Sequence, residues 1–377
     1  MNKNSLILLF CFVTILSNFS FAGDIELWKN SGPIKANGNS LSLYNKGDEI
    51  FLQGKTEISR TDFLIKADKS RIFQKTKGIK SFGNVFAKRI FDSGNYLEAF
   101  SNNIFYTDES KILEMFIVKD LNYFLQKENK IINLKSEYLK IDETKEIRTA
   151  NVKNMTSFTM PFEEIKEDGK KITGLDFIRS EKLKATGAIS AQDFDYVELN
   201  KKVFFDRKKS DNDHYTLKCD NLVYDKKVKI TTINDIEEAT YFSGKDKIKY
   251  FLTAKKVVWN MTDDNSDVIE IFGNPIVFRR EDDGYIIKAN KAVYYKKDGR
   301  VWFTQNPILL QNDKDGKGIY KAENIYYFME TKLLKFEKNV NIEFVPRKKK
   351  EEKKEIQKPA EKNIKKGKKD KKDAAKS

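Results

Sequence analysis

The chain has 377 residues, of which 40% are apolar and 34% charged, and its formal net charge is +15. Of its two cysteines, Cys11 lies in the apolar N-terminal run, so Cys219 stands alone in the rest of the chain, which excludes a fold held by internal disulfides. Residues 347–377 carry a net charge of +9 and residues 23–346 only +5, so the basic excess belongs largely to the C-terminal tail.

Residues 1–22 have the layout of a cleavable signal peptide. A short polar start precedes an apolar run from Ser5 to Leu16, and Ser20 and Ala22 are the small residues expected just before a cut at Gly23. The run is shorter than a membrane-spanning helix needs, although an uncleaved N-terminal anchor is an alternative. No later stretch reaches a spanning length, so we expect export of a soluble mature chain.

A short sequence mark recurs along the body of the chain. An apolar, a polar and a small residue are followed, five residues after the small one, by an apolar or aromatic residue, as in Ile65-Lys66-Ala67 to Ile72. Most copies are 28 to 37 residues apart, which is typical of a repeat protein. The small residues are Ala67, Ala99, Ser136, Ala191, Cys219, Ala254, Ala289 and Ala322.

A second mark keeps the same period. Phe82-Gly83-Asn84-Val85 has later counterparts around Asn274, Asn306 and Asn339, which are 32 and 33 residues apart. Two successive copies of the first mark, at Ser136 and Ala191, are farther apart than the others. The irregular stretch between them predicts an insertion at about 150–182, or a degraded copy of the repeat. Two marks with one period indicate an elongated array.

The repeat is predicted to be a β unit. Apolar and polar residues alternate, as in Ile287-Lys288-Ala289-Asn290, and β-branched and aromatic residues are abundant. In a straight strand, the residue five after the small one would point to the opposite face. Because it is apolar in all eight copies, we expect a corner or bulge that turns it back inward. Stacked bent ribbons would then enclose a narrow apolar interior.

These marks resemble the OstA/LptA-like family of lipopolysaccharide-transport proteins. The nearest matches are Phe82-Gly83-Asn84-Val85, Ile65-Lys66-Ala67-Asp68-Lys69 and Ile287-Lys288-Ala289-Asn290-Lys291, within a resemblance that covers roughly Gly38 to Phe344. It implies an all-β periplasmic protein, an elongated stack of antiparallel bent strands forming an open twisted β-jelly roll, whose groove shields acyl chains between the two membranes. The chain is about twice as long as the small members, lacks the large C-terminal barrel of the outer-membrane member and adds a lysine-rich tail.

The resemblance and the strand parity together predict a lipid-binding groove. The implied partners are lipopolysaccharide or another glycolipid, other lipid-transport proteins of either membrane docked on edge strands, and further copies of the chain joined head to tail. For the aromatic members of the lining, plain core packing is an alternative to cargo contact. The predicted lining residues are Ile65, Ala67, Leu97, Ala99, Leu134, Leu217, Tyr224, Leu252, Ala254, Trp259, Ile287, Ala289, Tyr294 and Tyr327.

The sequence carries no motif of an enzyme that we can identify. There is no Walker loop, HExxH motif or nucleophile elbow, and we expect no catalytic residue, metal or cofactor. The single histidine, His214, is predicted to lie at the surface beside a turn. We therefore expect a lipid-binding bridge. The alternative is a structural or adhesive β-solenoid with a filled core and no lipid cargo.

Residues 347–377 are predicted to form a disordered tail, because they are rich in lysine and lack aromatic residues and periodicity. A passive solvated tail and contact with an anionic membrane surface are both compatible with this composition. Nucleic acid is not an expected partner, since the signal peptide directs the chain away from it and no aromatic residue among the lysines could stack on bases.

Overall fold

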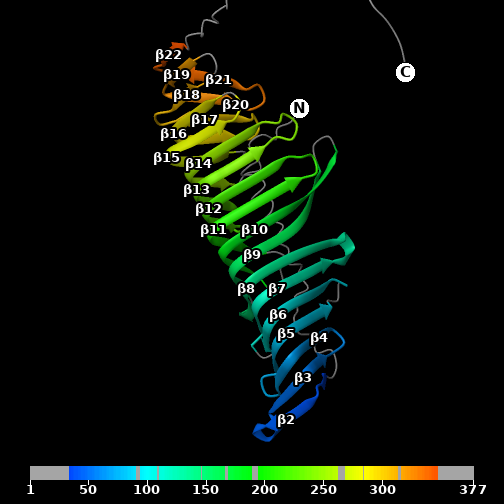
Figure 1. Cartoon of the computed structure of the whole chain (residues 1–377). Helices are drawn as coiled ribbons and strands as arrows, with labels where there is room; N and C mark the ends of the chain where they lie inside the picture. The colour runs from blue at the N-terminus through cyan, green and yellow to red at the C-terminus, as the bar shows by residue number, and fades with distance from the viewer. Residues whose placement is uncertain are drawn as a thin grey trace, which may run out of the picture.

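The structure is a computed structural model that describes residues 34–90, 94–107, 110–145, 147–165, 169–188, 194–261, 268–282, 284–312 and 316–346. The predicted signal peptide and the predicted tail lie outside these residues. The described residues form one antiparallel sheet of 22 strands with two short 3-10 turns, η1 (Asn45–Gly47) and η2 (Gln126–Glu128). Figure 1 shows the strands stacked one after another into a long body, from β2 at one end to β22 at the other. The predicted all-β stack of bent antiparallel strands is confirmed.

The stack has long strands in its middle and short ones at both ends. It begins with β1 (Lys35–Asn37) and β2 (Ser40–Tyr44). The long strands are β3 (Glu49–Ser59), β4 (Phe63–Phe73), β5 (Gly78–Ile90), β6 (Tyr96–Thr107), β7 (Ile112–Leu125), β8 (Lys130–Lys145), β9 (Ile147–Ile165), β10 (Lys171–Ala188), β11 (Tyr196–Lys209), β12 (His214–Asp225), β13 (Ile230–Phe242), β14 (Lys249–Asn260), β15 (Val268–Arg280) and β16 (Tyr285–Tyr295). The stack ends with β17 (Arg300–Thr304), β18 (Ile308–Asn312), β19 (Gly316–Lys321), β20 (Asn324–Phe328), β21 (Leu333–Glu337) and β22 (Asn341–Pro346).

The first sequence mark is a corner in the even-numbered long strands. In β4, Ala67 and Ile72 are both buried, while Asp68 and Lys69 between them are both exposed. The pairing with β5 shifts register at this point, so two successive outward residues reset the alternation. The predicted corner is confirmed, and it returns the later apolar residue to the interior.

The second mark is the matching corner of the odd-numbered strands. In β5, Gly83 and Asn84 have φ angles of 71° and 45°, and the register shifts between Phe82 and Val85. A Cβ atom on Gly83 would lie 2.4 Å from a carboxylate oxygen of Asp68, so this position needs glycine for two reasons. Asn84 Nδ2 donates to the same carboxylate, at 3.1 Å, and thereby links two neighbouring corners. One repeat is therefore a pair of strands.

The corners divide the sheet into two walls. Each strand has one arm on either side of its corner. In wall A, residues 69–73 of β4 pair with 78–82 of β5, and in wall B, residues 63–66 of β4 pair with 86–89 of β5; the arms of the other long strands follow the same division. Side chains of alternate residues on both walls point into the space between them, where the buried apolar residues form one continuous core. The hairpin turns lie at the tips of the arms, away from the corners.

The stretch predicted as an insertion belongs to the sheet. It forms most of β9 and β10, which pair with each other from Ile147 with Ala188 to Ile165 with Lys171. Their wall B arms are simply longer than those of other strands. The copy of the mark predicted at Ala191 lies outside the described residues. In β10 the corner lies after Ser180, where Ile178, Ser180 and Leu183 are buried and the register shifts.

Candidate functional site

An apolar hollow lies between the two walls from β4 to the start of β11. The space without protein atoms in this hollow, including the part that is open to solvent, amounts to about 1210 Å³. Wall B contributes residues such as Ile65 and Leu134, and wall A contributes Met115, Leu139 and Leu183. Aliphatic and aromatic side chains make up most of this lining, so the hollow can accept hydrocarbon but offers few hydrogen-bonding groups.

Polarity rises toward the tips of the arms. In β5 the inward column runs from Val85 through Ala87 to Arg89, so the residue at the tip is an arginine rather than an apolar residue. In β9 the same column runs from Val152 through Ala150 to Arg148. The inward columns of these two arms, one on each wall, therefore end in a guanidinium group.

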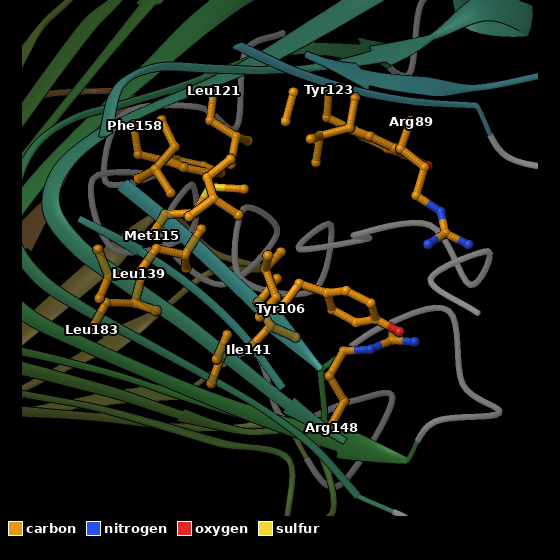
Figure 2. A pocket seen from close by; sticks show the side chains of 18 of the residues that line it. Arg89, Tyr106, Met115, Leu121, Tyr123, Leu139, Ile141, Arg148, Phe158 and Leu183 are labelled. Carbon is orange, nitrogen blue, oxygen red and sulfur yellow. The ribbon is translucent and has the colours of Figure 1, made fainter. Parts of the chain in front are cut away.

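The two arginines lie on one side of the hollow. Figure 2 shows Arg89 and Arg148 there, with the ring of Tyr106 reaching toward Arg148, whereas Leu139 and Leu183 lie on the opposite side. Arg148 Nε donates to Glu143 Oε1 at 2.7 Å, and both side chains are at most 4% exposed. Arg89 Nη2 lies 3.6 Å from Asp62 Oδ2, and burial lowers the pKa of Arg89 to about 10 although Asp62 opposes the shift.

The far half of the stack contains packed aromatic rings. Tyr215 stacks on Tyr241 with ring centroids 4.7 Å apart, and Tyr241 stacks on Tyr250 at 5.9 Å. The series continues through Phe278 to Tyr327, with centroid separations of 6.2 and 5.6 Å. Arg280 Nη1, on wall B, donates to the hydroxyl of Tyr327, on wall A, at 3.1 Å. Tyr215, Tyr241, Tyr250 and Phe278 line wall B, and the Phe278–Tyr327 ring contact and this hydrogen bond join wall B to wall A at β20.

A buried ion pair separates the hollow from the rings. Arg207 of β11 donates two hydrogen bonds to Asp176 of β10, at 2.7 and 2.8 Å, and the side chains are 3% and 0% exposed. The guanidinium carbon lies 4.0 Å from the centre of the Phe162 ring. Lys209, next along the inward column, pairs with Glu164 and lies over Tyr215. Burial raises the pKa of Asp176 even beside Arg207.

The structure places the predicted lining residues in two groups. Ile65, Leu97 and Leu134 line the hollow, and Ala67 and Ala99 are buried in the same half of the core. The rest are buried in the core between β12 and β20, toward the aromatic half. They are Leu217, Tyr224, Leu252, Ala254, Trp259, Ile287, Ala289, Tyr294 and Tyr327. Their predicted contact with a lipid stays a prediction.

Sequence reasoning missed the two arginines and most of the ring series. The sequence does contain a signal for the rings. In each strand, the residue two positions before the apolar residue of the mark also points inward, and this residue is Tyr215 before Leu217 and Tyr250 before Leu252. Arg89 likewise continues the parity of Val85. The prediction of the lining did not include charged residues at the ends of strands, although such residues can also point inward.

Other features of the described residues offer no catalytic arrangement that we can identify. His214 is partly exposed, as predicted, and its Nε2 lies 2.8 Å from Asp206 Oδ1 on the neighbouring strand. Within the described ranges, no group of three or more His, Cys, Asp or Glu side chains could hold a metal ion. Nor do these ranges contain a helix long and apolar enough to cross a membrane. That the protein is not an enzyme stays a prediction.

Comparisons with known proteins give one structural match to report. No protein-family model and no curated protein matches the sequence. Among solved structures, the chain is similar to LptH from Pseudomonas aeruginosa, described as the LptA homologous periplasmic component of the conserved lipopolysaccharide transport device. The TM-score is 0.28 and the identity 16%, over 35% of this chain and 93% of that chain. The family resemblance of the sequence stays a prediction.

Proposed function

We propose that this protein is a periplasmic carrier that shelters the acyl chains of lipopolysaccharide or a related glycolipid on the way to the outer membrane. The observation that carries the proposal is the apolar hollow between β4 and β11, which is partly open to solvent and lined from both walls by flexible apolar side chains. No chemical step is required of such a protein, only a site that replaces water around hydrocarbon.

The energetics fit a carrier. Exposing an acyl chain to water costs about 0.8 kcal/mol per CH₂ group, so a chain of roughly a dozen carbons costs about 10 kcal/mol. Burial against Met115, Leu139 and Leu183 would remove much of this cost. A partly open hollow also lets a lipid enter sideways, with its headgroup left at the arm tips, so the acyl chains need not thread through a closed pore.

Photocrosslinking in cells tests the proposal directly. A photoreactive amino acid at Leu183, which lines the hollow, should capture lipid that mass spectrometry identifies after purification. The matched control is Lys184, the next residue of β10, which is exposed on the outer face of the same strand. Because the two positions differ in face but share a strand, a difference in captured lipid reports the hollow itself.

The result expected is lipid on the Leu183 variant and little or none on the Lys184 variant. Equal labelling of both positions, or no lipid on either in a folded and exported protein, would contradict the proposal. A dry hollow in cells would instead support the alternative of a structural β-solenoid, which the packed rings between Tyr215 and Tyr327 already resemble in the far half.

A further inference from the structure

We propose that β11 and β12 form a septum, a packed layer that closes the hollow on the side toward β22. The septum consists of the inward side chains of these two strands, together with the Asp176 carboxylate that Arg207 holds. Hydrocarbon bound in the hollow stops at this layer, so the hollow is a bounded binding site and not one section of a channel along the whole stack. The inference rests on the proposed function and adds the limit of the space that the cargo can occupy.

The first argument is where the lining of the hollow ends. Along the chain the lining runs from Phe63 to Phe194, which lies two residues before the start of β11. On wall B the last strand that contributes to it is β9, with Phe158, and the partner of Phe158 in β10 is Ile178, which is only 2% exposed. The hollow therefore gives way to close packing one strand before the septum.

The second argument is how closely the next two strands are packed. On both walls, none of the inward side chains of β11 and β12 belongs to a residue that is more than 6% exposed. Leu199 on wall A and Phe205 and Leu217 on wall B are at most 2% exposed. In the hollow, by contrast, Ala87 and Leu97 are only half-buried. Space for hydrocarbon would leave accessible surface on the side chains around it, so the septum is filled by its own side chains.

The third argument is the cost of making room within this layer. Arg207 and Asp176 lie directly opposite each other on neighbouring strands of wall B, and two hydrogen bonds join them, at 2.7 and 2.8 Å. Hydrocarbon that separated them would leave two buried charges apart, and an acyl chain offers neither a counter-charge nor a hydrogen-bonding group in exchange. The septum thus closes the axial path by volume, and the ion pair raises the cost of opening it.

Photolabelling of the full wild-type chain tests where hydrocarbon stops. The probe is stearic acid with a diazirine at the end of its acyl chain, and mass spectrometry maps the residues that carry adducts. Adducts that excess unlabelled stearic acid prevents are specific. We expect specific adducts on residues of the hollow such as Met115, Leu139 and Leu183. Leu252 and Ile287, which face the core beyond the septum, should carry at least about tenfold less label, a ratio that corresponds to about 1.4 kcal/mol.

Two double variants test whether the ion pair is part of the septum. Asp176→Ala/Arg207→Ala removes both charges together, which leaves no buried charge without its partner, and it also removes most of the volume of both side chains. Specific adducts should then spread to Tyr215, which lies directly opposite residue 207 on β12. Asp176→Leu/Arg207→Met is the matched control, because it removes the same charges but keeps most of the volume. Its adducts should stay within the hollow.

Specific adducts on Leu252 or Ile287 of the wild type, at a yield similar to that in the hollow, would overturn the inference, since hydrocarbon would then pass the septum. Adducts confined to the hollow in a folded Asp176→Ala/Arg207→Ala variant would overturn the part assigned to the ion pair. If that variant does not fold, the wild-type map decides alone. A folded wild type without specific adducts in either half would overturn the proposed function as well, whereas adducts in both halves overturn only the septum.

Discussion

Replacing Arg207 by methionine should destabilise the middle of the stack strongly. Methionine preserves much of the volume but leaves the Asp176 carboxylate, which is 0% exposed, without the two hydrogen bonds from Arg207. Breaking one side of a buried ion pair costs about 3–5 kcal/mol, because a charge stays buried without its partner. The contact of the guanidinium with Phe162 is lost too and adds about 1 kcal/mol or less.

The cost should depend on pH in a defined direction. In Arg207→Met, burial without a partner raises the pKa of Asp176 above the 3.8 of an exposed carboxyl group. A carboxyl group whose pKa is raised on folding favours the folded state most at low pH, and this contribution is lost as the pH rises toward the folded pKa. Relative to the double variant Asp176→Leu/Arg207→Met, the single variant should lose about 1.4 kcal/mol per pH unit above about pH 4.

Urea unfolding followed by far-UV circular dichroism measures the free energies, and hydrogen exchange in β10 and β11 shows whether the loss is local, as expected for a stacked array. The double variant should recover most of the stability and show little of the pH dependence. A single variant within about 1 kcal/mol of wild type at neutral pH, or one whose deficit does not grow with pH, would refute the view of this pair as a desolvated ion pair.

Two further predictions concern the far half and the end of the stack. Tyr241→Ala should cost about 3–5 kcal/mol in urea unfolding, since the ring is 2% exposed between Tyr215 and Tyr250. It should leave the binding of an apolar dye in the hollow unchanged. Altered dye affinity in a folded variant would mean that the two halves of the stack are coupled. Phe344→Lys should weaken any end-to-end association seen by sedimentation, because β22 pairs on one side only, with β19, and exposes Phe344 at 46%. Association that is unchanged by the lysine would exclude docking through this edge.

The corners were predictable because they leave a local trace in the sequence. Ala67 and Ile72 are both apolar at odd spacing, and only a reset of the alternation can bury both. The copy predicted at Ala191 lies outside the described residues. The corner of β10 after Ser180 was not predicted, because it lies 44 residues after Ser136, outside the expected spacing, and this greater distance follows from the longer arms of β9 and β10.

The difference between the two halves could not be read from the mark alone. The mark contains Leu134 and Leu217 in equivalent places, yet Leu134 lines the hollow and Leu217 is buried in the half that contains the ring series. What differs is the residue that precedes it in the inward column, Ile132 in β8 and Tyr215 in β12. Whether the two walls leave space between them depends on the summed volumes of the side chains that face each other from wall A and wall B. These side chains belong to residues far apart in the sequence.

The division of the stack also bears on how a carrier of this shape would use its length. If lipid occupies the hollow, its path along the axis toward β22 meets the Asp176–Arg207 pair and then the ring series that begins at Tyr215. Passage would require hydrocarbon to displace a buried ion pair and stacked rings, at a cost that the apolar contacts of an acyl chain do not offset. Entry and exit between the arm tips, beside Arg89 and Arg148, require no such rearrangement.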